Sequence, residues 1–124
     1  MSADRVRDGH RIAQLLASEL ESGATPDALS VTDTDPDVEP TPEGALAFRV
    51  RDDAGEEIAV VYVQPDRARV EFRAVPGSVA DVAGEQGLRV RPTGSEPPRT
   101  IVFVADGAQV KWVLPAFQVA IEGE

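Results

Sequence analysis

Between residues 45 and 74 the chain alternates between apolar and polar side chains, and this period of two constrains the fold more than any other feature. In the segment 67–74 the apolar residues hold the even positions, and arginine or glutamate holds every odd one. Such alternation indicates a β-strand with one buried and one polar face. A second alternating segment covers 46–51, and the apolar run 58–63 between them suits a central strand. Because short turn sequences join the three segments, we expect an antiparallel meander.

A helix is predicted before the sheet, over residues 4–21, with Asp4 as its N-terminal cap. Apolar side chains recur along it at the spacing of an amphipathic helix, including Val6, Ile12, Ala13, Leu16 and Leu20. Gly9 lies near the centre of the apolar arc, where a missing side chain allows a close approach to the sheet. The helix is therefore expected to pack its apolar arc on the sheet.

The rest of the chain completes the expected fold. The remaining predicted elements are an acidic, proline-rich loop over 32–44, a short second helix near 78–86, and strands over 110–114 and 117–121 within a β-rich region, 45–122. The sequence therefore predicts a single α+β domain over residues 1–124. In it, an N-terminal amphipathic helix packs on an antiparallel β-meander of six or seven strands, and a strongly curved sheet or a partly closed barrel is the main alternative.

Charge and residue usage mark the chain as strongly acidic. It has 22 Asp and Glu residues against 12 basic ones, and only one of the basic residues, Lys111, is a lysine, for a net charge of -10. The absence of cysteine from the sequence removes disulfides, thiol nucleophiles and cysteine-based zinc sites. No apolar run approaches the roughly 18 residues that a membrane-spanning helix needs. We therefore expect no contact with a membrane and a cytoplasmic location.

This composition, together with the opening segment DGHRIAQLL at residues 8–16, resembles small uncharacterised proteins of halophilic archaea. The resemblance implies a cytosol at molar potassium chloride, where a Debye length of roughly 3 Å screens acidic self-repulsion. It extends over the whole chain through composition, but it names no activity and carries over no functional residues. An ordinary acidic bacterial protein is the alternative.

Signatures of catalysis are absent from the sequence. It has no glycine-rich phosphate loop, dinucleotide fingerprint, nucleophile elbow or paired-histidine zinc motif. The one histidine, His10, could act as a general base, with Asp8 and Glu19 as further acid–base candidates. Its place at the border of the apolar arc better suits a structural residue. We therefore expect a protein without catalytic activity or cofactor, with a small enzyme as an alternative.

Three carboxylates at alternate positions, Asp33, Asp35 and Asp37, resemble the start of a calcium-binding loop, because a hard cation needs several converging oxygens. The match then fails, since Val38 stands where the turn glycine belongs and Gly44 where the bidentate glutamate belongs. The three residues are a candidate metal site, and a solvated loop with loosely held cations is the preferred interpretation.

Seven of the eleven arginines fall on polar positions in or beside predicted strands. They are Arg49, Arg51, Arg67, Arg69, Arg73, Arg89 and Arg91. If the strands are neighbours, one sheet face carries a band of guanidinium groups, which suits bidentate binding of carboxylate or phosphate. Phe48 and Phe72 point to the other face by parity, which disfavours nucleic acid. The preferred alternative is that Glu57, Glu71 and Asp52 neutralise the arginines across strands.

The C-terminal third is apolar on both strand parities, which is more than one helix can cover. The candidate interface residues there are Val102, Val104, Trp112, Leu114 and Phe117. The sequence therefore predicts an interaction module that binds another protein or forms a homodimer. Binding of nucleic acid or another phosphate-rich ligand by the arginines is the second hypothesis. Packing inside a barrel-like sheet is an alternative use of the surplus apolar residues.

Overall fold

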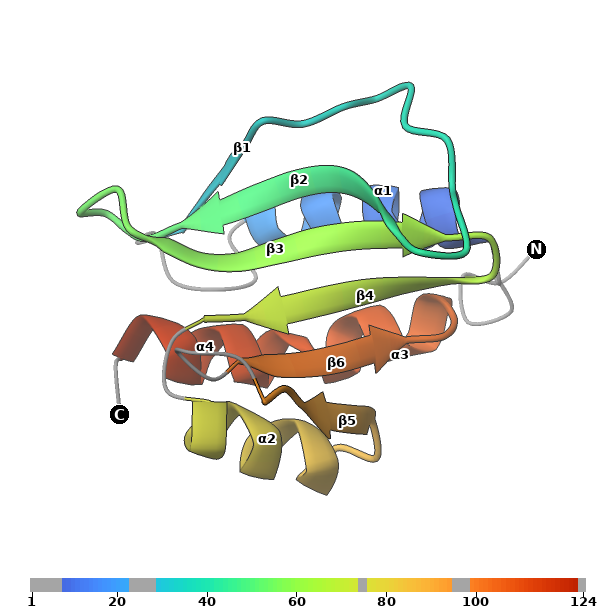
Figure 1. Ribbon diagram of the computed structural model, residues 1–124. Coiled ribbons are helices and arrows are strands. Elements are labelled where there is room, and N and C mark those ends of the chain that lie inside the picture. Colours follow the sequence, from blue (N-terminus) through green and yellow to red (C-terminus); the bar gives the residue numbers. More distant parts are fainter. Residues whose placement is uncertain (1–7, 23–28, 74–75, 95–98, 123–124) are drawn as a thin grey trace.

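The computed structural model describes residues 8–22, 29–73, 76–94 and 99–122 (Figure 1). Its elements in chain order are α1 (Gly9–Glu21), β1 (Ser30–Thr32), β2 (Ala45–Arg51), β3 (Glu57–Gln64), β4 (Arg67–Phe72), α2 (Pro76–Glu85), β5 (Arg89–Pro92), β6 (Thr100–Val104), α3 (Gly107–Trp112) and α4 (Leu114–Glu122). The six strands pair antiparallel in the order β1-β2-β3-β4-β6-β5, and the sheet is open. The predicted α+β class, central meander and short second helix are confirmed.

The four helices of the described chain pack on one face of the sheet. Figure 1 shows α1 and α4 behind the strands. Side chains from every helix, such as Leu16 of α1 and Val79 of α2, join the inward side chains of the strands in one hydrophobic core. Near its centre the rings of Phe72 from β4 and Phe117 from α4 meet edge to face, with centroids 4.8 Å apart. In the described ranges, no helix covers the opposite face of the sheet.

Asp8 caps the first helix. Its Oδ1 atom accepts hydrogen bonds from the backbone N–H groups of His10, at 2.9 Å, and Arg11, at 3.3 Å. These bonds satisfy donors that have no partner within the helix, which is why a short acidic side chain is favoured at this position. The described helix therefore begins at Gly9, and the predicted cap, Asp4, lies outside the described residues.

Gly9 sets how closely α1 approaches the sheet. Its backbone N–H donates to the carbonyl oxygen of Pro65, at 3.2 Å, in the turn between β3 and β4. A Cβ atom at Gly9 would lie 1.8 Å from the carbonyl oxygen of Gln64 and 2.6 Å from that of Arg67. Both distances are far below contact, so only glycine fits here. The close approach predicted at this glycine is confirmed.

The C-terminal segments 110–114 and 117–121, predicted as strands, are helical. Asp106 caps α3 by accepting from the backbone N–H of Gln109 at 3.0 Å, while the Gln109 side chain accepts from the N–H of Ala105 at 2.8 Å. These two bonds satisfy donors at the start of the helix, much as in a capping box. Burial at residues 110, 113, 116, 117 and 120 follows a helical spacing.

A β-bulge in β3 decides which face of the sheet receives Glu57. Ala59 pairs with Val50, yet Glu57 pairs with the next residue of β2, Arg51, so Ile58 is an extra residue in the ladder. Without it, strict alternation would place Glu57 on the same face as Ala59, in the core. The bulge instead places the Glu57 carboxylate on the uncovered face, among the arginines.

Candidate functional site

The uncovered face of the sheet carries the arginines that the alternation predicts for it. We call it the arginine face, and its arginines are Arg49, Arg51, Arg67, Arg69, Arg73, Arg89, Arg91 and Arg99. The register places Tyr62, Arg69, Phe103 and Arg89 in one row across β3, β4, β6 and β5. Because these strands are neighbours, arginines far apart in the sequence lie side by side on one surface.

Glu57 holds two of these arginines. Its carboxylate accepts from Nη1 of Arg49 at 2.5 Å and lies 2.8 Å from Nη1 of Arg73. The Glu57 side chain is only 14% exposed, whereas those of Arg49 and Arg73 are about one third exposed, so the carboxylate is shielded and its partners still reach water. The hydrogen bond to Glu57 and the negative charge of Glu57 raise the pKa of Arg49 above its usual value. The pairing therefore adds to the strong preference that any guanidinium group has for its charged form.

Glu71 likewise forms ion pairs with two arginines, at the centre of the sheet. Its carboxylate lies 3.5 Å from Nη2 of Arg69 and 3.3 Å from Nη1 of Arg99. The Nε atoms of both arginines are buried, and neither has a hydrogen-bond partner among the described residues. A buried donor without a partner costs free energy of folding. The ion pairs with Glu71 therefore hold the two guanidinium groups in place although each lacks one hydrogen bond.

Two aromatic side chains lie beneath the arginines. The guanidinium carbon of Arg67 stands 4.2 Å from the ring centroid of Phe103, and that of Arg89 stands 5.8 Å from the same centroid. Arg69 lies 4.7 Å from the centroid of Tyr62. These cation–π contacts fix the guanidinium planes against the sheet. Phe103 is only 7% exposed, because the arginines cover it.

The arginine face differs in sign from the rest of the protein. Its eight arginines and the three carboxylates that pair with them, Asp33, Glu57 and Glu71, give it a net charge of +5. The other described residues hold fifteen carboxylates and two basic side chains, a net charge of -13. Exposed Arg89 and Arg91 have no carboxylate partner in the described part of the chain. Cross-strand pairing therefore neutralises this face only in part.

Asp52 does not take the role predicted for it. Instead of pairing with an arginine, its Oδ1 atom accepts from the backbone N–H groups of Ala54, at 3.0 Å, and Glu56, at 2.9 Å. This arrangement closes the turn between β2 and β3. The sequence-based prediction of the arginine band did not include Arg99, Tyr62 or Phe103, and it assigned Asp33 to a candidate metal site instead.

The three aspartates of the acidic loop serve separate purposes. Asp33 lies 3.4 Å from Arg49 and 3.7 Å from Arg51, so its carboxylate belongs to the arginine face. Asp35 accepts from the backbone N–H of Asp37 at 3.0 Å. Among the described residues, no group of three or more histidine or acidic side chains is placed to hold a metal ion. The structure therefore does not gather the candidate metal ligands.

Most of the predicted interface residues lie in the core. Val102, Val104 and Phe117 have no exposed surface, because they face the helices or the sheet from within. Leu114 is half-buried, and Trp112 is 40% exposed. The surplus of apolar residues in the C-terminal third is thus largely used in packing α3 and α4. Self-association of the protein stays a prediction.

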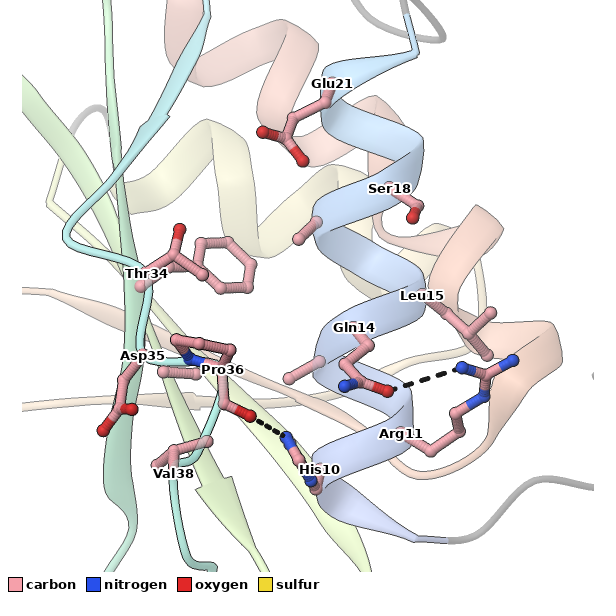
Figure 2. A pocket seen from close by; sticks show the side chains of 14 residues that line it. His10, Arg11, Gln14, Leu15, Ser18, Glu21, Thr34, Asp35, Pro36 and Val38 are labelled. Atoms are coloured by element: carbon pink, nitrogen blue, oxygen red, sulfur yellow. Dashed lines mark hydrogen bonds between the residues drawn. The ribbon is translucent and has the colours of Figure 1, made fainter.

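The acid–base candidates on α1 are not brought together. Asp8 is engaged as the helix cap, and the Nε2 atom of His10 lies 3.2 Å from the carbonyl oxygen of Pro36, to which it can donate. Glu19 follows His10 by nine residues, or about 13 Å along a helix. The three side chains therefore form no catalytic pair, although His10 does line a groove beside α1 (Figure 2).

Comparison with known proteins places the chain in a family but assigns no activity to it. A family model described as a family of unknown function, DUF7993, matches residues 1–124. Neither a curated protein nor a solved structure matches the chain. In the described ranges, no helix has the length and hydrophobicity to cross a bilayer. The arginine face is therefore the feature from which a function has to be inferred.

Proposed function

Because this chain belongs to a family of unknown function, DUF7993, its role must be inferred from its own surfaces, and we propose that it is a non-catalytic interaction module that binds an acidic segment of a partner protein. The observation that carries this proposal is the arginine face, with its net charge of +5 on an uncovered sheet of a chain with a net charge of -10. A surface of this sign attracts anionic partners.

The arrangement of the arginines favours carboxylates. A guanidinium group presents a planar fork that matches a carboxylate in bidentate geometry. Arg89 and Arg91 alternate along β5, so their Cα atoms lie about 7 Å apart. Carboxylates at alternate positions of an extended segment repeat at the same distance. An extended acidic segment would therefore pair with this edge of the face residue by residue.

Nucleic acid is the second candidate, favoured by the presence of Tyr62 and Phe103 on the arginine face. Sheets that bind single strands stack bases on such rings. Here, however, Arg67 and Arg89 already cover Phe103, and Arg69 lies over Tyr62. The rings orient guanidinium groups and leave no free ring face for a base to stack on. This arrangement suits a carboxylate ligand better than a nucleic acid.

The test is a comparison of two anionic probes on the intact protein. Fluorescence anisotropy would measure binding of a labelled acidic peptide with glutamate at alternate positions, and of a single-stranded RNA of equal charge. We expect the peptide to bind more tightly than the RNA at equal salt. Replacing both exposed arginines, R89E and R91E, should weaken peptide binding by at least about tenfold, because each loses a charge-assisted contact and gains repulsion.

The control is Arg11→Glu, which makes on the exposed surface of α1 the same charge change as either R89E or R91E alone, half that of the pair, and should leave peptide binding within about twofold. If R11E weakens binding as much as the R89E and R91E pair, attraction to the whole molecule explains the signal and the proposal is wrong. Tighter binding of the RNA would select the second candidate. The acidic segment could also come from a second copy of this chain. Light scattering of the free protein would then give a molar mass larger than that of one chain.

The acidity of the remaining surface supports adaptation to a salt-rich cytoplasm as part of the same proposal. The sequence uses 22 acidic residues, eleven arginines and one lysine. In dilute buffer this charge repels itself and opposes the compact state, whereas at molar salt the repulsion is screened over roughly 3 Å. Binding to the arginine face then relies on close, bidentate contacts rather than on long-range attraction.

Thermal unfolding should therefore depend on salt. We expect Tm to rise steadily as potassium chloride increases from about 0.1 M to about 3 M, since screening relieves repulsion among the carboxylates. Replacing Asp35, Asp37 and Glu39 together by their amides should reduce this slope, because these exposed side chains contribute to the repulsion. A Tm that is flat or falls with salt would exclude the adaptation.

A further inference from the structure

A groove of about 400 Å³ runs between α1 and the segment 34–38, away from the arginine face (Figure 2). This volume lies in the range of small-molecule sites, which combine an apolar floor with a few polar groups. The floor is apolar, with Ala13 and Ala17 of α1 on one side and Ala47 and Phe48 of β2 on the other. The groove therefore offers an apolar slot suited to a flat or narrow ligand.

The two ends of the groove differ. At one end, the hydrogen bond between the His10 ring and the carbonyl oxygen of Pro36 joins α1 to the facing segment. At the other end, the Glu21 side chain extends from α1 toward the groove, and Thr34 lies on the facing wall (Figure 2). The groove is thus closed at the His10 end, and a ligand bound in it would meet the carboxylate of Glu21 at the other end.

The charge at the Glu21 end is uncompensated. Glu21 forms no ion pair with any described residue, and the last turn of α1 contains no basic side chain. The C-terminus of a helix carries a partial negative charge, which adds to that of the carboxylate. The one arginine among the described lining residues, Arg11, donates from Nη1 to Oε1 of Gln14 at 3.4 Å and precedes Glu21 by ten residues, about 15 Å along the helix.

We propose that this groove binds a small organic cation, in which an apolar body rests on Phe48 and the alanines and an ammonium group meets Glu21. The proposal is independent of partner binding on the arginine face. The ammonium group would neutralise the Glu21 carboxylate and the partial negative charge at the end of the helix, and the apolar body would cover Ala17, the one residue of the floor that is not buried.

The test uses 2-phenylethylamine as the probe, followed by two-dimensional amide NMR of the intact protein. The matched probes 3-phenylpropionate and 2-phenylethanol replace the ammonium group by an anion or a neutral hydroxyl. At millimolar concentrations we expect the amine alone to shift amide signals in residues 13–21 and 34–38. Glu21→Gln should weaken amine binding by about fivefold or more, because it removes the charged partner.

Glu19→Gln is the matched control, since it makes the same charge change on the same helix outside the groove, and it should leave the affinity within about twofold. Ala17→Leu should block binding by filling the slot, because Ala17 is a half-buried residue of its wall. Equal binding of the three probes, equal loss in E19Q and E21Q, or shifts confined to other residues would each overturn the proposal, as would no shift at all.

Discussion

Replacing Gly9 by alanine is expected to cost about 3 kcal/mol or more of unfolding free energy, because the new methyl group has nowhere to go. Its Cβ atom would fall 1.8 Å from the carbonyl oxygen of Gln64 and 2.6 Å from that of Arg67. Both obstacles are backbone atoms, so relief requires that α1 move away from the turn between β3 and β4. Chemical denaturation followed by circular dichroism would measure the loss.

Gly84→Ala is the matched control within a helix. A Cβ atom at Gly84 meets nothing within 4 Å. Because alanine is a better helix former than glycine, this variant should be neutral or more stable by up to about 1 kcal/mol. If G9A and G84A had the same effect, the close approach of α1 to the sheet would not be a feature of the folded protein.

Truncating Phe72 to alanine is expected to destabilise the protein by about 3–5 kcal/mol and to lower Tm by about 10–20 °C. Phe72 and Phe117 are both fully buried, and their edge-to-face contact joins β4 to α4 across the core. The alanine variant would lose the buried ring and leave a cavity beside Phe117. Thermal melts and denaturant titrations of the same samples would measure both quantities.

Phe72→Leu is the control for this variant, since it keeps an apolar side chain of intermediate size and should cause a markedly smaller loss. A loss in F72A no larger than in F72L would mean that the ring does not fill the centre of the core. Such a result would also mean that Phe117 of α4 does not pack on the Phe72 ring in the folded protein.

The alternation between residues 45 and 74 was enough to predict the central strands, their antiparallel order and the face that holds the arginines. It works because the period of a strand is two, so a polar residue at every second position fixes a whole face. Gly9 could be predicted for a similar reason, since a glycine in the middle of an apolar arc marks a close approach of backbones.

The C-terminal helices could not be predicted in the same way. A helix that buries Val110, Val113, Phe117 and Ala120 has apolar residues on both strand parities, so it resembles a doubly buried strand when period two is assumed. The pair Asp106-Gly107 then indicates a hairpin turn. The opposing signal was the spacing of Asp106 and Gln109, which is typical of a helix start.

The positions of two residues on the arginine face could not be predicted from the alternation of apolar and polar residues. Glu57 reaches this face only through the bulge at Ile58, and no residue in a run of apolar side chains marks where a bulge falls. The face to which Tyr62 points cannot be inferred from the same run either, since every position in it is apolar. Its parity becomes known only from the pairing of Tyr62 with Arg69.

The placement of all described helices on one face has a consequence for how the protein moves in an electric field. The arginine face carries +5 and the other described residues -13, so the described part of the chain has a permanent dipole that points out of the uncovered face. In dilute buffer, a charged surface or partner exerts a torque on such a dipole before any atoms touch, so the sheet turns toward an anion and away from a cation although the chain is strongly acidic. At molar salt, screening over roughly 3 Å limits this orientation to the last few ångströms of approach.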